Sequence, residues 1–353
     1  MILLRTVGTF FFYLISFSLM WLYVYSKIRD WRSAFVSAFL YFGVFVWALS
    51  ETLGFFKLLG LTGLLCGWIG YNVVLLILVV LAYKKGAIQF KIPQSFSFRW
   101  EYFALGFILC VTFFTAIAYP PNNWDSMTYH LPRIEHWLQN KSLNHYYTSN
   151  TRQVRFAPFA EILILQGRAL SGDDYLMNLV QWFSLLGSVI GISKIASHFG
   201  MNKTMQSAAA LFFATVPMAI LQASSTQTDL VETFCIICLV ERFFAWRKTG
   251  AFYQALDFGL ALGLSILTKG TAYPIAFPLV LWFAIISIKN FQKRFLPAFL
   301  AAGLCLMLNF PHYARNYVLV GEPIGIHYGT VSNFSAKSFI ITFVANITSN
   351  IVV

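Results

Sequence analysis

A short polar segment, NNWDSMTYHLPR (122–133), carries side chains that can move protons and bind anions. Asp125 is followed within eight residues by Tyr129, His130 and Arg133. A carboxylate can accept the proton of a hydroxyl nucleophile as a new bond forms, and guanidinium, imidazole and phenol groups can orient a substrate or hold its phosphate. The alternative for Asp125 is the N-cap of a helix, where Asp is strongly preferred.

Further charged residues lie at the ends of apolar segments. Asp229 and Glu232 are one helical turn apart at the start of such a segment, where carboxylates also stabilise the helix dipole. Lys269 lies between two apolar segments in SILTKGTAYP, and Arg315 follows another in HYARNYVLVGEP. A cation in such a place either binds an anion or extends to the lipid headgroups, and both interpretations stay open here.

The composition shows what must position these side chains. Of 353 residues, 58% are hydrophobic and 11% are charged, too few polar groups to cover a water-soluble globule. The sequence predicts an all-α integral membrane protein. Its N-terminal apolar stretch is too long for a signal peptide and is interpreted as a retained span. At about 20 apolar residues per span, roughly ten are expected, near 7–25, 33–50, 58–83, 102–119, 174–197, 204–221, 229–245, 254–268, 273–288 and 295–312.

Charge asymmetry orients these spans. If they alternate in direction, 15 of the 25 Lys and Arg residues fall on one side, which the positive-inside rule makes cytoplasmic. Asp125, Asp229, Lys269 and Arg315 then share the opposite, outer side. The net charge of +12 is explained by this topology, so no nucleic-acid partner is expected.

The longest outer segment, 120–173, is rich in aromatic residues and lacks the composition of a flexible linker. Within it, apolar residues recur at helical spacing while polar ones occupy the opposite side: Leu131, Ile134 and Leu138 against Arg133, His136 and Asn140. This pattern predicts an amphipathic helix on the membrane surface, anchored by Trp124 and Trp137. Pro132 either kinks this helix or marks its first turn. A second amphipathic helix is expected at 156–170.

The order of these motifs, namely NNWDSMTYHLPR, SSTQTDLVE, LTKGTAYP and ARNYVLVGEPI, resembles the C-type (GT-C) glycosyltransferase superfamily. Within it, the chain is most similar to protein O-mannosyltransferases, lipid A aminoarabinose transferases and related transferases of lipopolysaccharide sugars. The resemblance covers about residues 100–325. It implies additional membrane helices in 1–99, a catalytic membrane module in 100–325, and a truncated C-terminal region starting in 326–353.

The resemblance also implies a function. Such enzymes move a sugar from a polyprenyl-phosphate donor to a lipid, glycan or protein acceptor outside the cytoplasm. Asp125 would be the catalytic base, and substrate-binding roles fall to Tyr129, His130, Arg133, Asp229, Lys269 and Arg315. A divalent metal ion at Asp229 is allowed, and no organic cofactor is expected. The expected location is a bacterial inner membrane, with the active site facing the periplasm or cell exterior.

Two alternatives belong to other classes of protein. A transporter or flippase of lipid-linked sugars would also have many spans, a basic inner side and charges within the membrane. Transporters, however, commonly show internal repeats and ionisable residues near the bilayer midplane, whereas the polar residues singled out here lie at the outer boundary. A noncatalytic membrane scaffold is the other alternative.

Overall fold

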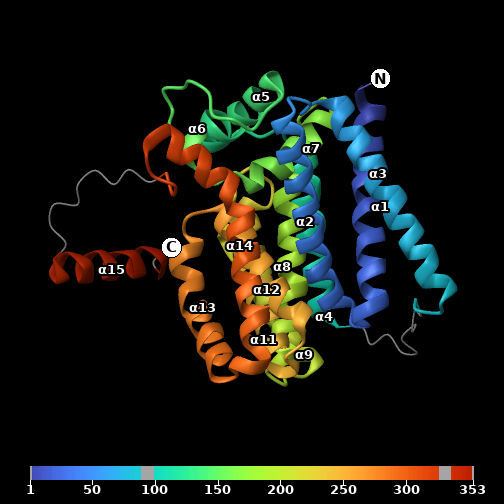
Figure 1. Cartoon of the computed structure of the whole chain (residues 1–353), viewed down its shortest axis with the longest axis vertical. Helices are drawn as coiled ribbons and strands as arrows, with labels where there is room; N and C mark the ends of the chain where they lie inside the picture. The colour runs from blue at the N-terminus through green and yellow to red at the C-terminus, as the bar shows by residue number, and fades with distance from the viewer. Residues whose placement is uncertain (1, 89–98, 326–334, 352–353) are drawn as a thin grey trace.

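The computed structural model describes residues 2–88, 99–325 and 335–351, and every regular element in these ranges is a helix (Figure 1). The residues beside the two expected domain boundaries, 89–98 and 326–334, lie outside the described ranges. The helices are α1 (Ile2–Ile28), α2 (Trp31–Phe55), α3 (Leu61–Lys84), α4 (Trp100–Ala118), the π-helical turn η1 (Ser126–His130), α5 (Leu131–Asn140), α6 (Arg152–Arg155), α7 (Phe159–Ser171), α8 (Leu179–His198), α9 (Lys203–Ala214), α10 (Pro217–Gln222), α11 (Asp229–Thr249), α12 (Phe252–Thr268), α13 (Ala272–Lys289), α14 (Phe291–Val320) and α15 (Ala336–Ile351).

Seven of the described helices are long and apolar enough to cross a membrane, namely α1, α2, α3, α4, α8, α13 and α14. The chain is therefore typical of a helical, membrane-embedded protein. The expected number of about ten spans is not confirmed, for a different reason in each remaining segment. Pro217 begins α10 and interrupts the segment shared with α9, since proline has no backbone N–H. Helix α11 carries Glu241 and Arg242, and α12 has only 17 residues.

The segments α12 and α13 form a hairpin and not one kinked passage. Phe258, near the start of α12, stacks on Phe283, near the end of α13, with ring centroids 4.2 Å apart. Such a contact requires the chain to reverse direction between the two helices. The reversal occurs at residues 269–271, so Lys269 lies in the connection.

Helix α12 packs closely against α14 through two glycines four residues apart. A Cβ at Gly259 would lie 2.3 Å from the carbonyl oxygen of Ala301, and one at Gly263 would lie 3.1 Å from the Cα of Cys305. Small residues at this spacing allow helix backbones to approach each other in a membrane. This contact holds α14, which carries Arg315, against α12.

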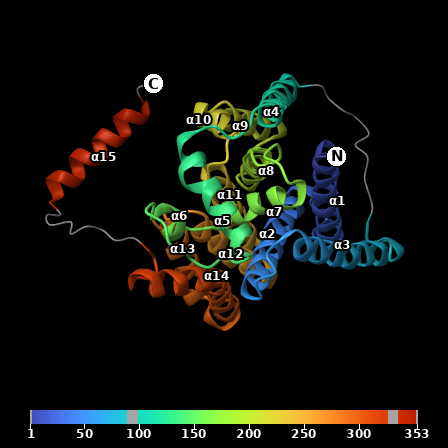
Figure 2. The ribbon, with the colours of Figure 1, turned by 90° about the horizontal axis from the view of Figure 1, so that it is seen from above.

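The segment 120–173 differs from expectation in its second helix. Helix α7 was expected to lie on the membrane surface, but most of its residues are buried. It lies between the helices of the bundle, below α5, and its Phe159 belongs to the same core cluster as residues of α2, α11 and α12. The N-terminal helices therefore share a core with the rest of the chain. Only α15 lies apart from the bundle in both views (Figures 1 and 2).

The first outer helix also differs in detail. Pro132 does mark the first turn of α5, as one of the two expectations had it. Trp124 is 79% exposed, as suits an interfacial anchor, but Trp137 is buried and packs with Ile134 in a core cluster. Arg133, expected on the solvated side, is also buried, with its guanidinium 4.7 Å from the centre of the Trp137 ring. Helix α5 therefore covers the end of the bundle, and both its polar and its apolar face contain buried residues.

Candidate functional site

Asp125 lies at the start of η1 without serving as its cap. The side chain of Asn123 accepts the hydrogen bond from the backbone N–H of Ser126, at 2.8 Å. Asp125 itself is in helical conformation, half-buried, and its carboxylate makes no capping bond. The carboxylate lies beside Tyr129, and burial, together with this neighbouring charge, raises the pKa of Tyr129. Tyr129 therefore stays a neutral phenol that can donate a hydrogen bond.

A hydroxyl contact connects η1 to the segment that precedes α11. Thr226 donates to Ser126 across 2.5 Å, and both side chains are fully buried. Ser126 directly follows Asp125, and Thr226 precedes Asp229 by three residues. The two segments that carry these carboxylates are therefore in contact at this end of the bundle.

His130 and Arg133 are held in a buried group with Glu161 of α7. The Nδ1 atom of His130 is 2.8 Å from Oε1 of Glu161, and Nη1 of Arg133 is 3.3 Å from the same oxygen. Nη2 of Arg133 donates to the carbonyl of Phe156 at 2.6 Å. Burial acts to raise the pKa of Glu161, but Arg133 and His130 outweigh it and hold the pKa below its ordinary value. The group is closed to solvent, because the side chains of Arg133 and Glu161 are each 1% exposed.

Asp229 and Lys269 form the most accessible charged pair of the expected site. Nζ of Lys269 is 2.6 Å from Oδ1 of Asp229, and their side chains are 38% and 44% exposed. Beside them, Thr271 donates to Glu232, with its hydroxyl 2.7 Å from both carboxylate oxygens. These contacts join the start of α11 to the connection between α12 and α13. They place the Lys269 ammonium and the Asp229 carboxylate at a boundary that solvent reaches, with Glu232 buried beside them.

Arg315 forms a two-pronged ion pair with Glu51 at the end of α2. Nη1 and Nη2 each lie 2.7 Å from one oxygen of the carboxylate. The next residue, Asn316, accepts a hydrogen bond from Nε2 of His145 at 2.9 Å and donates to Nε2 of His312 at 3.1 Å. Burial lowers the pKa of His145 to about 4, so this imidazole is neutral at pH 7.

The expected site residues thus fall into separate contacts. In the part of the chain that the structure describes, no hydrogen bond or ion pair connects Asp125 to Asp229, Lys269 or Arg315. Lys269 is accessible to a ligand, whereas the facing edge of the Arg315 guanidinium is occupied by Glu51. His130 and Arg133 are buried against Glu161, where they support the segment that carries Asp125 and Tyr129.

Glu161 and Glu51 are important members of these contacts that the sequence did not single out. Glu161 lies in FAEILILQ, an apolar helix in which an unpaired acid would be costly, so its position was a signal for a buried partner. Glu51 carries no such signal, because it lies at the end of an apolar segment, where exposed charges are common.

The carboxylates do not by themselves make a metal site. Among the described residues, no three His, Cys, Asp or Glu side chains are grouped so that they could hold a metal ion. Asp229 is neutralised by Lys269, and Glu232 is engaged by Thr271. The residues present therefore do not fit a divalent cation, and no metal is used in the mechanism below.

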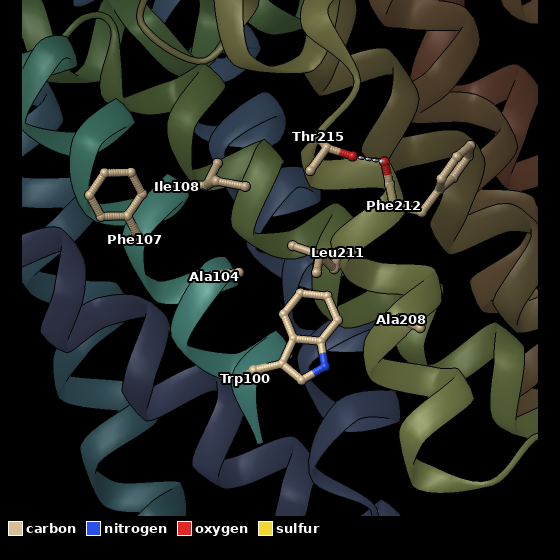
Figure 3. A pocket seen from close by; sticks show the side chains of 8 residues that line it. All are labelled: Trp100, Ala104, Phe107, Ile108, Ala208, Leu211, Phe212 and Thr215. Carbon is tan, nitrogen blue, oxygen red and sulfur yellow. Dashed lines mark hydrogen bonds between the residues drawn. The ribbon is translucent and has the colours of Figure 1, made fainter. Parts of the chain in front are cut away.

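The better-defined hollows of the surface lie away from these residues. A groove of about 510 Å³ between α4 and α9 is lined by Trp100, Phe107, Leu211 and other apolar side chains (Figure 3). Its one hydroxyl, on Thr215, donates to the carbonyl of Phe212. Apart from this hydroxyl and the indole N–H of Trp100, the lining is apolar, so the groove suits contact with lipid chains. The chain matches no model of a known protein family, no curated protein and no solved structure.

Proposed function

We propose that the chain is a membrane glycosyltransferase that uses a polyprenyl-phosphate sugar and an acceptor outside the cytoplasm. About ten segments would then cross the membrane: the seven long helices, residues 203–222, α11 and α12. The protein would lie in the bacterial inner membrane, with the end that bears α5 facing outward. The resemblance to GT-C enzymes in four ordered motifs supports this assignment.

The carboxylate of Asp125 is the observation on which the proposal depends. An N-cap role would explain an aspartate at this position without any chemistry, but Asn123 makes the capping bond. The carboxylate is left half-buried at a π-helical turn, a feature that is frequent at functional sites. Apart from the phenol of Tyr129 beside it, no described side chain engages this carboxylate.

The reaction would proceed as a single displacement at the anomeric carbon. The acceptor hydroxyl attacks C1 of the sugar while Asp125 takes its proton, and the bond between C1 and the phosphate oxygen breaks. The electron pair of that bond leaves with the polyprenyl phosphate. The negative charge on the leaving phosphate needs a cation, which Lys269 supplies from its exposed position beside Asp229. Tyr129 donates a hydrogen bond that orients Asp125 or the acceptor.

The test compares Asp125→Asn with Asn123→Ala. Loss of a general base predicts that Asp125→Asn lowers transfer from a polyprenyl-phosphate sugar by about 10²-fold or more, with unchanged thermal stability. Asn123→Ala removes the cap, which costs about 1 kcal/mol of stability, and should leave most of the turnover. Full activity of Asp125→Asn would refute the mechanism. If Asp125→Asn lost as much stability as Asn123→Ala, the role of Asp125 would be structural.

A buried charge cluster favours the second function, transport of a lipid-linked sugar. Arg242 of α11 is buried and paired with its neighbour Glu241 and with Asp257 of α12, whose carboxylate accepts from Ser37 and Tyr41 of α2. Ionisable groups within a membrane commonly mark transport pathways. Here, though, the members are held by partners from four helices, including His198 of α8, as in a structural clamp. Flux of a lipid-linked sugar in proteoliposomes without any transfer, lost in Asp257→Asn, would establish transport instead.

A further inference from the structure

A large apolar cavity lies between the N-terminal helices and the rest of the bundle. It has a volume of about 590 Å³ and is lined by side chains of α1, α2, α3, α4, α7 and α8, and of Leu176 just before α8. Viewed from above, α1 and α4 stand apart, with α8 and α7 behind them (Figure 2). The volume lies within the range of roughly 300–1,000 Å³ that is typical of small-ligand sites.

The cavity opens at the hydrocarbon-facing surface of the bundle. Phe114 and Cys110 of α4 and Leu14 of α1 line it and are exposed, so they form its rim. Phe10 and Phe113 approach each other across the opening, with ring centroids 6.2 Å apart. A rim of this kind admits a chain from the side, within the membrane.

A cation lies at the outer end of this cavity. Arg5 donates to the carbonyls of Leu170 and Ala169 at the end of α7, at 2.6 and 2.9 Å. Gly167, one turn earlier in α7, lines the cavity. Among the described residues no carboxylate forms an ion pair with Arg5, although Asp173 lies close by and pairs with the hydroxyl of Thr6. The exposed guanidinium therefore has capacity for an external anion at the height of the lipid headgroups.

We infer that this cavity binds one acyl chain of an anionic phospholipid of the bilayer, with its phosphate at Arg5. The lining is almost entirely apolar, with the hydroxyl of Tyr13 as a polar exception, and therefore favours an apolar chain. The cation at the outer end selects an anionic amphiphile. One water-sized group takes about 30 Å³, so 590 Å³ holds about 20 such groups, close to one acyl chain. A polyprenyl chain of several tens of carbons would extend well beyond the cavity. The site is independent of the proposed sugar transfer.

Two native cysteines provide an internal comparison. Cys110 lies on the rim of the cavity, whereas Cys66 of α3 is exposed but does not line it. The full chain is purified in detergent, stripped of lipid and treated with N-ethylmaleimide during titration with phosphatidylglycerol or phosphatidylcholine of the same acyl chains. Phosphatidylglycerol should slow labelling of Cys110 several-fold and leave Cys66 unchanged. Arg5→Gln should weaken phosphatidylglycerol binding about fivefold, the effect of one basic residue near an anionic headgroup.

A matched pair of glycine variants tests the cavity itself. Only Leu176 lies within 4 Å of a Cβ at Gly167, at 3.7 Å, so Gly167→Leu should fill the cavity without a clash at its Cβ. Gly106→Leu adds the same side chain in open space on α4. Native mass spectrometry should show one bound phosphatidylglycerol in the wild type and in Gly106→Leu, and none in Gly167→Leu. If Gly167→Leu does not fold, Cys110→Phe at the rim replaces it.

Three results would overturn the inference. Equal lipid retention in Gly167→Leu and the wild type would place the lipid elsewhere on the surface. Protection of Cys110 by inorganic phosphate alone would exclude an acyl chain as the occupant. Protection of Cys110 by a polyprenyl phosphate at lower concentration than phosphatidylglycerol would make the cavity a donor site. Transfer activity of Gly167→Leu, measured separately, tests the proposed function.

Discussion

Removal of the Glu161 carboxylate should destabilise the protein strongly, because Arg133 would then be a buried charge without a counterion. The pair is closed to water, with both side chains 1% exposed and Nη1 3.3 Å from Oε1. Breaking one side of such a pair typically costs about 3–5 kcal/mol. We expect Glu161→Leu to show the full effect. Glu161→Gln should show less, because its amide oxygen still accepts from the guanidinium.

The chain offers a matched control in the same segment, 120–173. Glu135 of α5 pairs with Arg168 at 2.5 Å, but these side chains are 40% and 26% exposed. An exposed pair contributes roughly 0–1 kcal/mol, so Glu135→Leu should change stability little. Thermal unfolding is followed by tryptophan fluorescence in one detergent, and the order of the transition temperatures is compared, since membrane proteins commonly unfold irreversibly.

A double variant separates lost charge from lost packing. Arg133→Met combined with Glu161→Leu replaces the pair with apolar side chains and should recover much of the stability lost in Glu161→Leu. The pKa of Glu161 is held below its ordinary value, so its contribution is present above about pH 4.3 and is lost as the pH falls. Glu161→Gln should lack this acid-dependent loss. Equal transition temperatures for Glu161→Leu and Glu135→Leu would refute the reasoning.

Three further predictions concern the remaining contacts of the site. Lys269→Ala should raise the donor KM, and Lys269→Arg should preserve it. Asp229→Asn frees the ammonium of Lys269 and should not raise the donor KM. An unchanged donor KM in Lys269→Ala would exclude phosphate binding at this lysine. Glu51→Gln should lower the transition temperature while leaving Arg315 in place, and no change would show that their two-pronged pair adds nothing to stability. The pKa of His145 is lowered to about 4, so as the pH falls the unfolded chain binds a proton at this residue before the folded chain does. Stability should therefore fall as the pH drops from 6.5 towards 4. His145→Gln should flatten this dependence in melting curves recorded over a series of pH values.

The sequence predicted the helices well because membrane spans are long apolar runs. The expected segment 33–50 lies within α2, and 102–119 ends one residue beyond α4. The expected segments 229–245 and 254–268 likewise lie within α11 and α12, but these two helices are not confirmed as membrane spans. In α11, Glu241 and Arg242 interrupt the apolar run, and only their pairing with residues of other helices makes burial acceptable. Hydropathy along one chain segment cannot report such partners.

The candidate site was harder to predict because its contacts join distant segments. Glu161 pairs with residues about 30 positions earlier, and Arg315 pairs with Glu51 across 264 positions. Helical periodicity placed Arg133 on the solvated side, since it counts only polar and apolar neighbours on one helix. The structure buries both sides of α5 because α7 lies inside the bundle, and Glu161 on α7 meets the arginine there.

The choice between base and cap for Asp125 shows what residue types leave undecided. NNWD offers Asn122, Asn123 and Asp125 as caps, and all three are residue types suited to that role. The starting register of the helix decides among them. Here the helical conformation continues backwards from the π-helical turn through residue 125, so the backbone N–H of Ser126 faces Asn123 and not the aspartate. A start two residues later would have made Asp125 the cap. One shift in register thus separates a structural carboxylate from one that is free to take a proton.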